Sequence, residues 1–165
     1  MTTGYAPKSL GRAYAFKFLY ALMHPKSSED KKTLLESEDF AKDLATAFEQ
    51  FDSSYFEPDE EHLQNGMLSP KVLEFSRELI EKVLLQEEQL KKIIRPYLKR
   101  RTLEQLDRVE LTVLLMSTLE LKEFSGTPAK VVMNEAIELS KQYGSKESGP
   151  FINGILDPIS KKYAE

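Results

Sequence analysis

The fold is decided by residues 103–124, which read LEQLDRVELTVLLMSTLELKEF. Apolar residues recur there at helical spacing in two rows: Leu106, Val109, Val113 and Met116 in one, and Leu111, Leu114, Leu115 and Leu121 in the other. A helix that is apolar on nearly every side must be covered by other elements, so we expect it at the centre of the protein. Thr102, followed three residues later by Gln105, predicts a capping box that opens this helix.

Helical spacing continues on both sides of this stretch, and no segment alternates polar and apolar residues with period two. We expect further helices at about 8–23, 40–51, from Ser69-Pro70 onward with a break near 86–88, at 127–143 and at 150–163. Residues 26–37 and 52–68 are expected to be irregular. The sequence therefore predicts an all-α fold of about seven helices in two packed small bundles. These are sub-bundles of about 1–86 and about 87–165 within a single domain over 1–165.

The composition excludes several classes of function. The chain has 165 residues, no cysteine and two histidines, His24 and His62, which rules out a thiol nucleophile, a disulfide framework and Cys-ligated metals. No nucleophile elbow, phosphate-binding loop or dinucleotide motif is present, so we expect no catalytic residue, metal or cofactor, and no enzyme activity. The longest uncharged apolar run, 111–119, is about half of the ~20 residues that span a membrane. With no signal sequence, we expect a cytoplasmic protein without membrane contact.

The charge is unevenly distributed. The formal net charge of −4 argues against a polyanionic partner. Residues 29–65, however, hold twelve acidic residues against three lysines, whereas 1–28 carry four basic residues, 91–101 carry six, and neither of these two stretches contains an acid. Two interpretations stay open: solvated helix faces, or an anion-binding surface assembled from two distant segments.

Several stretches of the C-terminal half have a distinctive order and spacing. They are LDRVE (106–110), LEL (119–121), PAKVVMNEAIEL (128–139), YG (143–144) and FINGILD (151–157). Over roughly residues 95–160 the chain closely resembles the NusB family of bacterial transcription antitermination factors. The resemblance implies an all-helical protein that binds boxA-type single-stranded RNA together with NusE, a small-subunit ribosomal protein. It also implies a non-catalytic role with RNA polymerase in an antitermination complex on ribosomal RNA operons.

The resemblance also implies site residues. For RNA binding these are Arg12, Glu147 and Phe151, to which charge and aromatic character add Lys8, Tyr97, Lys99 and Arg101, and for the NusE interface they are Tyr20 and Glu110. Lys8 and Arg12 are four residues apart and share a helix face suited to phosphates, and aromatic rings stack on bases of single strands. Structural roles are the alternative for each: a solubilising cationic face, aromatic residues of the core, and a glutamate near a helix start.

Residues 7–12 depart from the family pattern. They read PKSLGR, where members have several arginines, so RNA affinity is expected to be weaker than in the family, or to depend on Lys99-Arg100-Arg101. The alternative function is therefore a helical protein-interaction module or a self-masking homodimer with little intrinsic RNA binding.

Overall fold

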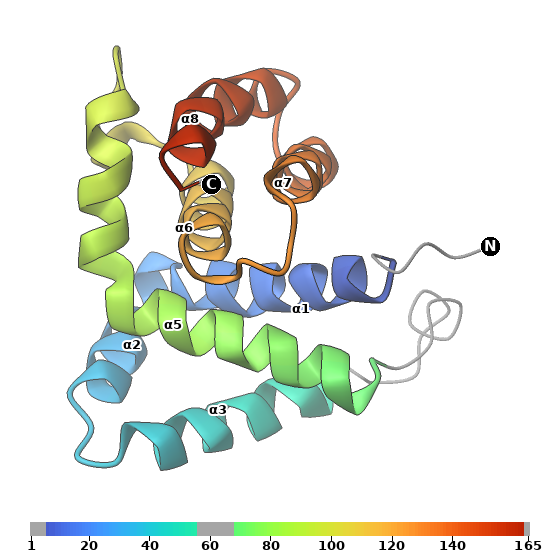
Figure 1. Cartoon of the computed structure of the whole chain (residues 1–165). Coiled ribbons are helices and arrows are strands. Elements are labelled where there is room, and N and C mark those ends of the chain that lie inside the picture. The colour runs from blue at the N-terminus through green and yellow to red at the C-terminus, as the bar shows by residue number, and fades with distance from the viewer. Residues whose placement is uncertain (1–5, 56–67, 164–165) are drawn as a thin grey trace. The chain divides into compact units, whose positions relative to one another are not determined.

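The computed structural model describes residues 6–55 and 68–163 (Figure 1). The α-helices in these ranges are α1 (Ala6–Leu22), α2 (Ser28–Leu35), α3 (Phe40–Tyr55), α5 (Pro70–Ile94), α6 (Arg108–Glu123), α7 (Ala129–Tyr143) and α8 (Ser148–Tyr163). Three short 3₁₀ turns lie at Pro25–Ser27, Arg95–Tyr97 and Leu103–Gln105. No strand occurs within the described ranges, and the prediction of an all-α fold with about seven helices is confirmed.

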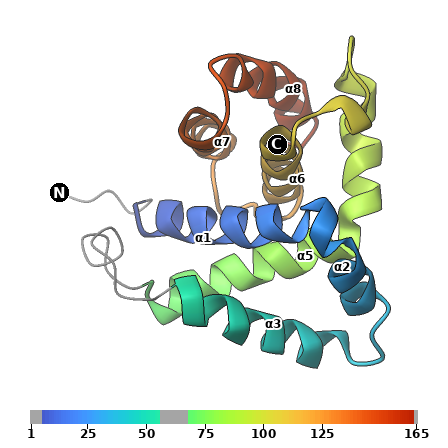
Figure 2. The ribbon, with the colours of Figure 1, turned by 180° about the vertical axis from the view of Figure 1, so that it is seen from behind.

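The chain forms two compact units, residues 1–81 and 82–165, and the division falls inside α5. In the first unit, α1, α3 and the first half of α5 lie side by side in both views (Figures 1 and 2). The aromatic face of α1 is buried, with Tyr14 and Leu19 0% exposed. The rings of Phe18 and Phe48, from α1 and α3, lie 5.1 Å apart between centroids. Aromatic packing therefore holds this unit together.

A polar cluster joins α1, α3 and the first half of α5 in the first unit. The Tyr14 hydroxyl donates to Asp52 Oδ1 at 2.5 Å, and Arg77 Nη2 donates to Asp52 Oδ2 at 2.5 Å. Burial, together with the hydrogen bond to Asp52, raises the pKa of Tyr14 above its ordinary value. The guanidinium of Arg77 also lies over the ring of Phe48, 5.1 Å from its centroid.

Gly11 permits a close approach between α1 and α5. The Ser76 hydroxyl donates to the Gly11 carbonyl at 2.8 Å. A Cβ atom at Gly11 would lie 2.8 Å from Ser76 Oγ and 2.8 Å from a methyl group of Val72. The glycine in the PKSLGR stretch is therefore required by helix packing.

In the second unit, α6, α7 and α8 pack against one another. Residues 112–120 of α6 are buried without interruption, as expected for a central helix. The second half of α5 meets the end of α6 through polar contacts: Lys122 Nζ donates to Gln86 Oε1 at 2.7 Å, and Gln86 Nε2 donates to Glu123 Oε2 at 3.0 Å.

Three expectations about regular structure are wrong. Part of the stretch expected to be irregular forms α2, whose Glu29 and Asp30 lie in the first helical turn, where the helix dipole favours acids. The expected break near 86–88 is absent, and α5 continues for 25 residues. Residues 86–89 are all good helix formers, and Lys91 pairs with Glu87 one turn earlier at 2.9 Å. In the second stretch expected to be irregular, residues 52–55 instead extend α3, and residues 56–67, with His62, lie outside the described residues.

The capping predictions have mixed outcomes. The hydroxyl of Ser69 accepts from the N–H of Val72 at 3.3 Å, so the predicted start of α5 is confirmed. Gln105 Oε1 accepts from the Thr102 N–H at 2.9 Å, but this contact closes only a 3₁₀ turn. The central helix begins five residues later than expected, at Arg108, because Asp107 caps it. Similarly, α8 begins at Ser148 rather than at residue 150.

Candidate nucleic-acid interface

A pocket in the second unit is lined by aromatic and cationic side chains. Its volume is about 410 Å³, and its walls come from residues 97–101 and from the first turns of α8. Tyr97, Lys99, Arg101 and Phe151, four residues of the predicted RNA site, all line it. The structure therefore brings these four side chains together around one opening.

The basic wall of the pocket results from the way α5 ends. Pro96 lies in the 3₁₀ turn Arg95–Tyr97, which closes when the Leu98 N–H donates to the Arg95 carbonyl at 3.1 Å. Leu98 then adopts an extended conformation, so the helix cannot continue. Lys99 and Arg100 follow in a bend and are exposed. A helix stop thus presents two cations to solvent beside the pocket.

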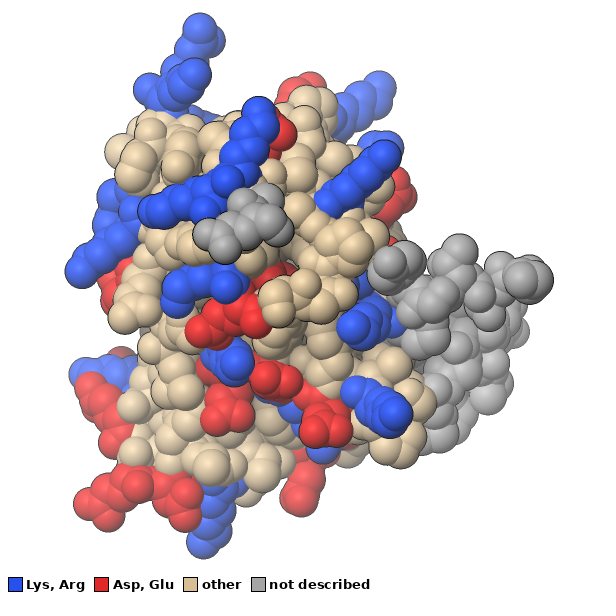
Figure 3. Space-filling model, in the orientation of Figure 1, with Lys and Arg blue, Asp and Glu red and all other residues tan. Residues whose placement is uncertain are grey.

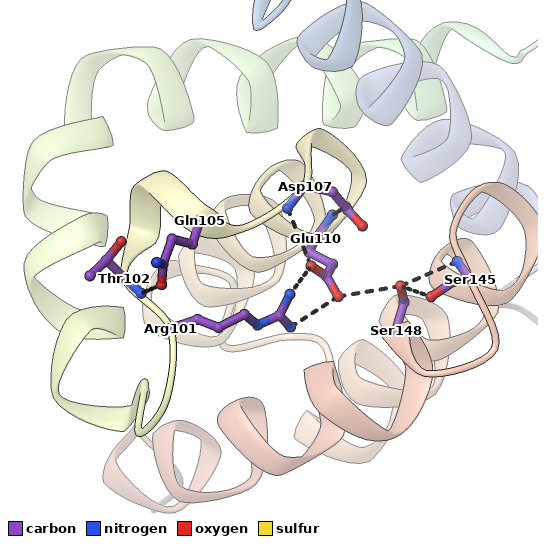
Figure 4. Close-up of polar contacts among 7 residues, drawn as sticks. All are labelled: Arg101, Thr102, Gln105, Asp107, Glu110, Ser145 and Ser148. Carbon is purple, nitrogen blue, oxygen red and sulfur yellow. Dashed lines mark hydrogen bonds and ion pairs between the residues drawn. The ribbon is translucent and has the colours of Figure 1, made fainter.

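Arg101 is held between a ring and a carboxylate. Its Cζ atom lies 4.0 Å from the centroid of the Phe151 ring. Its Nη1 and Nη2 atoms donate to Glu110 Oε1 at 3.1 Å and to Oε2 at 3.3 Å (Figure 4). The Arg101 side chain is 37% exposed and that of Glu110 only 4%. This bidentate ion pair fixes the guanidinium and balances its charge.

Glu110 is also bonded on its other sides. The Asp107 N–H donates to Glu110 Oε1 at 3.3 Å, and the Glu110 N–H donates to Asp107 Oδ1 at 2.7 Å, which makes the capping box of α6. The Ser148 hydroxyl donates to Glu110 Oε2 at 3.4 Å, and the Ser145 N–H donates to Ser148 Oγ at 3.3 Å (Figure 4). The start of α6 and the turn before α8 are therefore anchored on one carboxylate.

The remaining RNA-site residues of the sequence prediction lie elsewhere. Glu147 is exposed in the turn that Ser145 and Ser148 anchor, and it does not line the pocket. Lys8 and Arg12 belong to the first unit, where Lys8 Nζ and Arg12 Cζ each lie 5.3 Å from the centroid of the Phe75 ring. Lys8 is half-buried, whereas Arg12 is only 2% exposed. The predicted cationic row thus rests on an aromatic ring, with the arginine buried.

The two residues predicted for the NusE interface differ in exposure. Tyr20 is half-buried, and its ring stacks on that of Phe16 with 5.4 Å between centroids. Glu110 is 3% exposed and occupied by the contacts described above. Its environment favours the alternative considered for it, a glutamate that holds a helix start.

The sequence profile of the NusB family matches residues 10–161. This chain belongs to the NusB family. The transcription antitermination protein NusB of Syntrophotalea carbinolica is 37% identical over 121 residues, which cover 72% of this chain and 76% of that protein. The NusB of Myxococcus xanthus is 32% identical over 116 residues, covering 70% of this chain and 80% of that protein. The resemblance found in the sequence is confirmed, and the chain is a transcription antitermination protein of this family.

Solved structures agree with the NusB fold. T. maritima NusB superposes with a TM-score of 0.70 at 29% identity and covers 100% of this chain and 96% of its own. A crystal structure of the antitermination factors NusB and NusE in complex with dsRNA gives a TM-score of 0.67, with 98% and 100% coverage. At 20% identity, this second likeness bears on the fold alone.

Sequence reasoning missed parts of this NusB-family pocket. The exposed Arg100 lines it, but the sequence indicates this residue only as part of the run Lys99-Arg100-Arg101 and not as a site residue of its own. The pairing of Arg101 with Glu110 was also missed, because the two residues are separated by a 3₁₀ turn and a helix cap. No periodicity relates residues across such irregular segments.

Outside the pocket, the described residues of this NusB-family protein show an acidic region and no metal site. Residues 29–55, the described part of the acidic stretch found in the sequence, hold eight acidic residues against three lysines, and Figure 3 shows acidic side chains at the bottom of the view, where α2 and α3 lie. Within residues 6–55 and 68–163, no group of three or more His, Asp or Glu is arranged to hold a metal ion. No helix in the same ranges is both long and apolar enough to cross a membrane.

Proposed function

We propose that this chain binds boxA-type single-stranded RNA together with NusE and acts in the antitermination complex of RNA polymerase on ribosomal RNA transcripts. The observation that carries the proposal is the pocket in which Tyr97 and Phe151 lie beside Lys99 and Arg101. Single-stranded nucleic acids are commonly held by aromatic rings that stack on bases, next to cations that meet the phosphates. The names of the NusB relatives, which are transcription antitermination proteins, support the same role.

The roles of the individual residues follow from their exposure. Lys99 is exposed at the pocket, so it suits a phosphate contact, and the half-buried Lys8 offers a second one in the first unit. Tyr20 is the part of the predicted NusE interface that solvent reaches. Arg12 and Glu110 have little exposed surface for a direct contact with RNA or NusE. We expect these two side chains to act through the neighbours that they hold.

The proposal includes three further expectations. Binding of RNA and NusE needs no bond-making step, so we propose a non-catalytic role without metal or cofactor. We propose that residues 1–165 function as a single NusB-like domain. We also propose that the protein acts in the cytoplasm, where nascent ribosomal RNA is made.

The test is a titration of fluorescently labelled boxA RNA with the full chain, alone and with purified NusE. We expect NusE to tighten binding to boxA but not to a scrambled oligonucleotide, and binding to weaken steeply with salt. Equal affinity for both oligonucleotides in the presence of NusE would overturn the proposal. Light scattering then tests the alternative, since a homodimer that persists with NusE and does not bind RNA is the self-masking state.

A matched pair of variants assigns the binding to the pocket. Lys99→Ala removes an exposed cation that lines it, whereas Lys130→Ala removes an exposed cation on α7 that does not. We expect Lys99→Ala to reduce the slope of log K against log salt by about 0.7, the value for one phosphate contact on a single strand. Lys130→Ala should leave the slope unchanged, and equal slopes for the two variants would argue against the pocket.

A further inference from the structure

We propose that Arg101 serves as a stacking platform for a base of the bound strand, not as a phosphate ligand, and that Glu110 is the residue that positions it. This inference rests on the proposed RNA binding and assigns a new role to two of its residues. The base would lie on the face of the guanidinium that points away from Phe151. Ring, guanidinium and base would then form a three-layer stack.

The first argument is electrostatic. Glu110 contacts both terminal nitrogens of Arg101, at 3.1 and 3.3 Å, so the positive charge of the guanidinium is already balanced within the protein. A phosphate would have to compete with a carboxylate that is fixed by the capping box and by Ser148. Lys99 and Arg100 carry exposed charges at the same pocket and are better suited to phosphates.

The second argument is geometric. With its Cζ atom 4.0 Å from the ring centroid, the guanidinium covers one face of Phe151, and a base cannot occupy that same position. The Arg101 side chain is nevertheless 37% exposed and lines the pocket, so part of it faces the opening. Arginine planes stack on unpaired bases as aromatic rings do. An arginine supported from behind by a ring presents such a plane to the pocket.

The third argument concerns the rigidity of the platform. A free arginine loses much rotamer freedom when a base orders it, and that loss weakens binding. Here Glu110 has already fixed the guanidinium, and the Glu110 side chain is 4% exposed and bonded on several sides. The cost of ordering Arg101 is met when the protein folds, which is the advantage of pre-organisation.

Two substitutions of Arg101 separate stacking from charge. Arg101→Gln removes the charge, and Arg101→Lys keeps the charge but has no planar group. With the full chain, NusE and boxA RNA, we expect both variants to weaken binding, by roughly 5- to 150-fold, the range for loss of one stacked base. Arg101→Lys, which keeps the charge, should not change the salt slope. The loss should vanish on one oligonucleotide of a series in which each nucleotide in turn is made abasic.

The positioning role of Glu110 has a readout of its own. Glu110→Gln keeps the shape of the side chain and an acceptor for the Asp107 N–H, but it leaves the charge of Arg101 unbalanced. We expect this variant to fold. The freed charge of Arg101 should increase the salt slope by about 0.7. An added charge by itself should also strengthen binding at low salt, but we expect RNA binding to be weaker than that, because Arg101 is no longer held in place. A glutamate that served only as a helix cap would leave the slope unchanged, and that result would overturn the positioning role.

The outcomes distinguish this inference from the proposed function. If the wild-type complex fails to discriminate boxA from scrambled RNA, both fall. If it discriminates, but both Arg101 variants lose the same amount of binding on every abasic oligonucleotide, only the stacking platform falls. Full binding by Arg101→Lys would overturn it too. These Arg101 measurements do not depend on whether Glu110→Gln folds.

Discussion

The two units of the protein contain the same combination of four chemical groups in different settings. In the first unit, Asp52 binds Arg77 and the Tyr14 hydroxyl donates to the Asp52 carboxylate. The ring of Phe48 lies beneath the arginine. In the second unit, Glu110 binds Arg101 and the Ser148 hydroxyl donates to the Glu110 carboxylate. The ring of Phe151 lies beneath the arginine. The two arginine side chains are equally exposed, at 37%.

The two combinations differ in what surrounds the ring. Phe48, the ring beneath Arg77, is 7% exposed and packs against Phe18. Phe151, the ring beneath Arg101, is half-buried and lines the pocket. The arginine–carboxylate pair and its ring therefore contribute to packing where the ring is enclosed. Where the ring borders an opening, the same groups are accessible to a ligand. An ion pair by itself does not reveal which of the two roles it has.

The largest expected effect is the loss of stability when Phe48, the enclosed ring, is removed. Phe48→Ala should lower the free energy of unfolding by about 3–5 kcal/mol, because it leaves a cavity against Phe18 and withdraws the support of Arg77. Chemical denaturation of the full chain, followed by circular dichroism, measures this. A loss below about 1 kcal/mol, typical of surface positions, would remove the contrast between the two rings.

Substitution of Phe151, the ring that borders the pocket, should affect RNA binding more than stability. Phe151→Ala should weaken RNA binding in the presence of NusE by about 1–3 kcal/mol, since the stack loses its support. Its effect on unfolding should be clearly smaller than that of Phe48→Ala, because Phe151 is only half-buried. The same titration and denaturation assays measure both quantities. Stability losses of equal size in the two variants would show that Phe151 belongs to the core.

The smallest expected effect concerns the hydroxyl of the enclosed cluster. Tyr14→Phe removes the hydrogen bond to Asp52 and should cost about 1 kcal/mol at pH 7. Because the folded state raises the pKa of Tyr14 above 10.0, the phenol stays protonated there while the unfolded chain ionises. The stability due to Tyr14 is therefore fully present below pH 10 and is lost as the pH rises further.

Denaturation of wild type and Tyr14→Phe between pH 8 and 11 checks this sign. The difference in unfolding free energy between the two proteins should shrink above about pH 10. Ser148→Ala is the matched control, since it removes the corresponding hydroxyl in the second unit, and serine does not titrate in this range. A difference that grew with pH would contradict the protonated state of Tyr14.

The sequence was sufficient for the fold class and for several particular elements. The two apolar rows of 103–124 correctly indicated a buried central helix, and Ser69-Pro70 correctly marked a helix start. Both signals are local: a periodicity within one helix, or a side chain that caps its own chain three residues later. The family was recognisable because the order of the motifs in the C-terminal half is specific.

Features that depend on tertiary contacts were harder to predict. An eight-residue helix such as α2 is marginal on its own and is stabilised by packing, here through Leu34. For the candidate site, the resemblance pointed to residues that line the pocket, but neither spacing nor resemblance indicated that Arg101 is paired with Glu110. That pairing arises from two irregular segments whose paths are set by the whole second unit.

The pairing of Arg101 with Glu110 has a consequence for the kinetics of recognition. Long-range attraction between a protein and RNA depends on unbalanced charge, and it sets how often the two molecules meet. A balanced arginine adds little to that attraction, whereas a base stacked on it slows departure. The exposed Lys99 and Arg100 would then govern how fast RNA arrives, and Arg101, a few ångströms from Phe151, how long it stays.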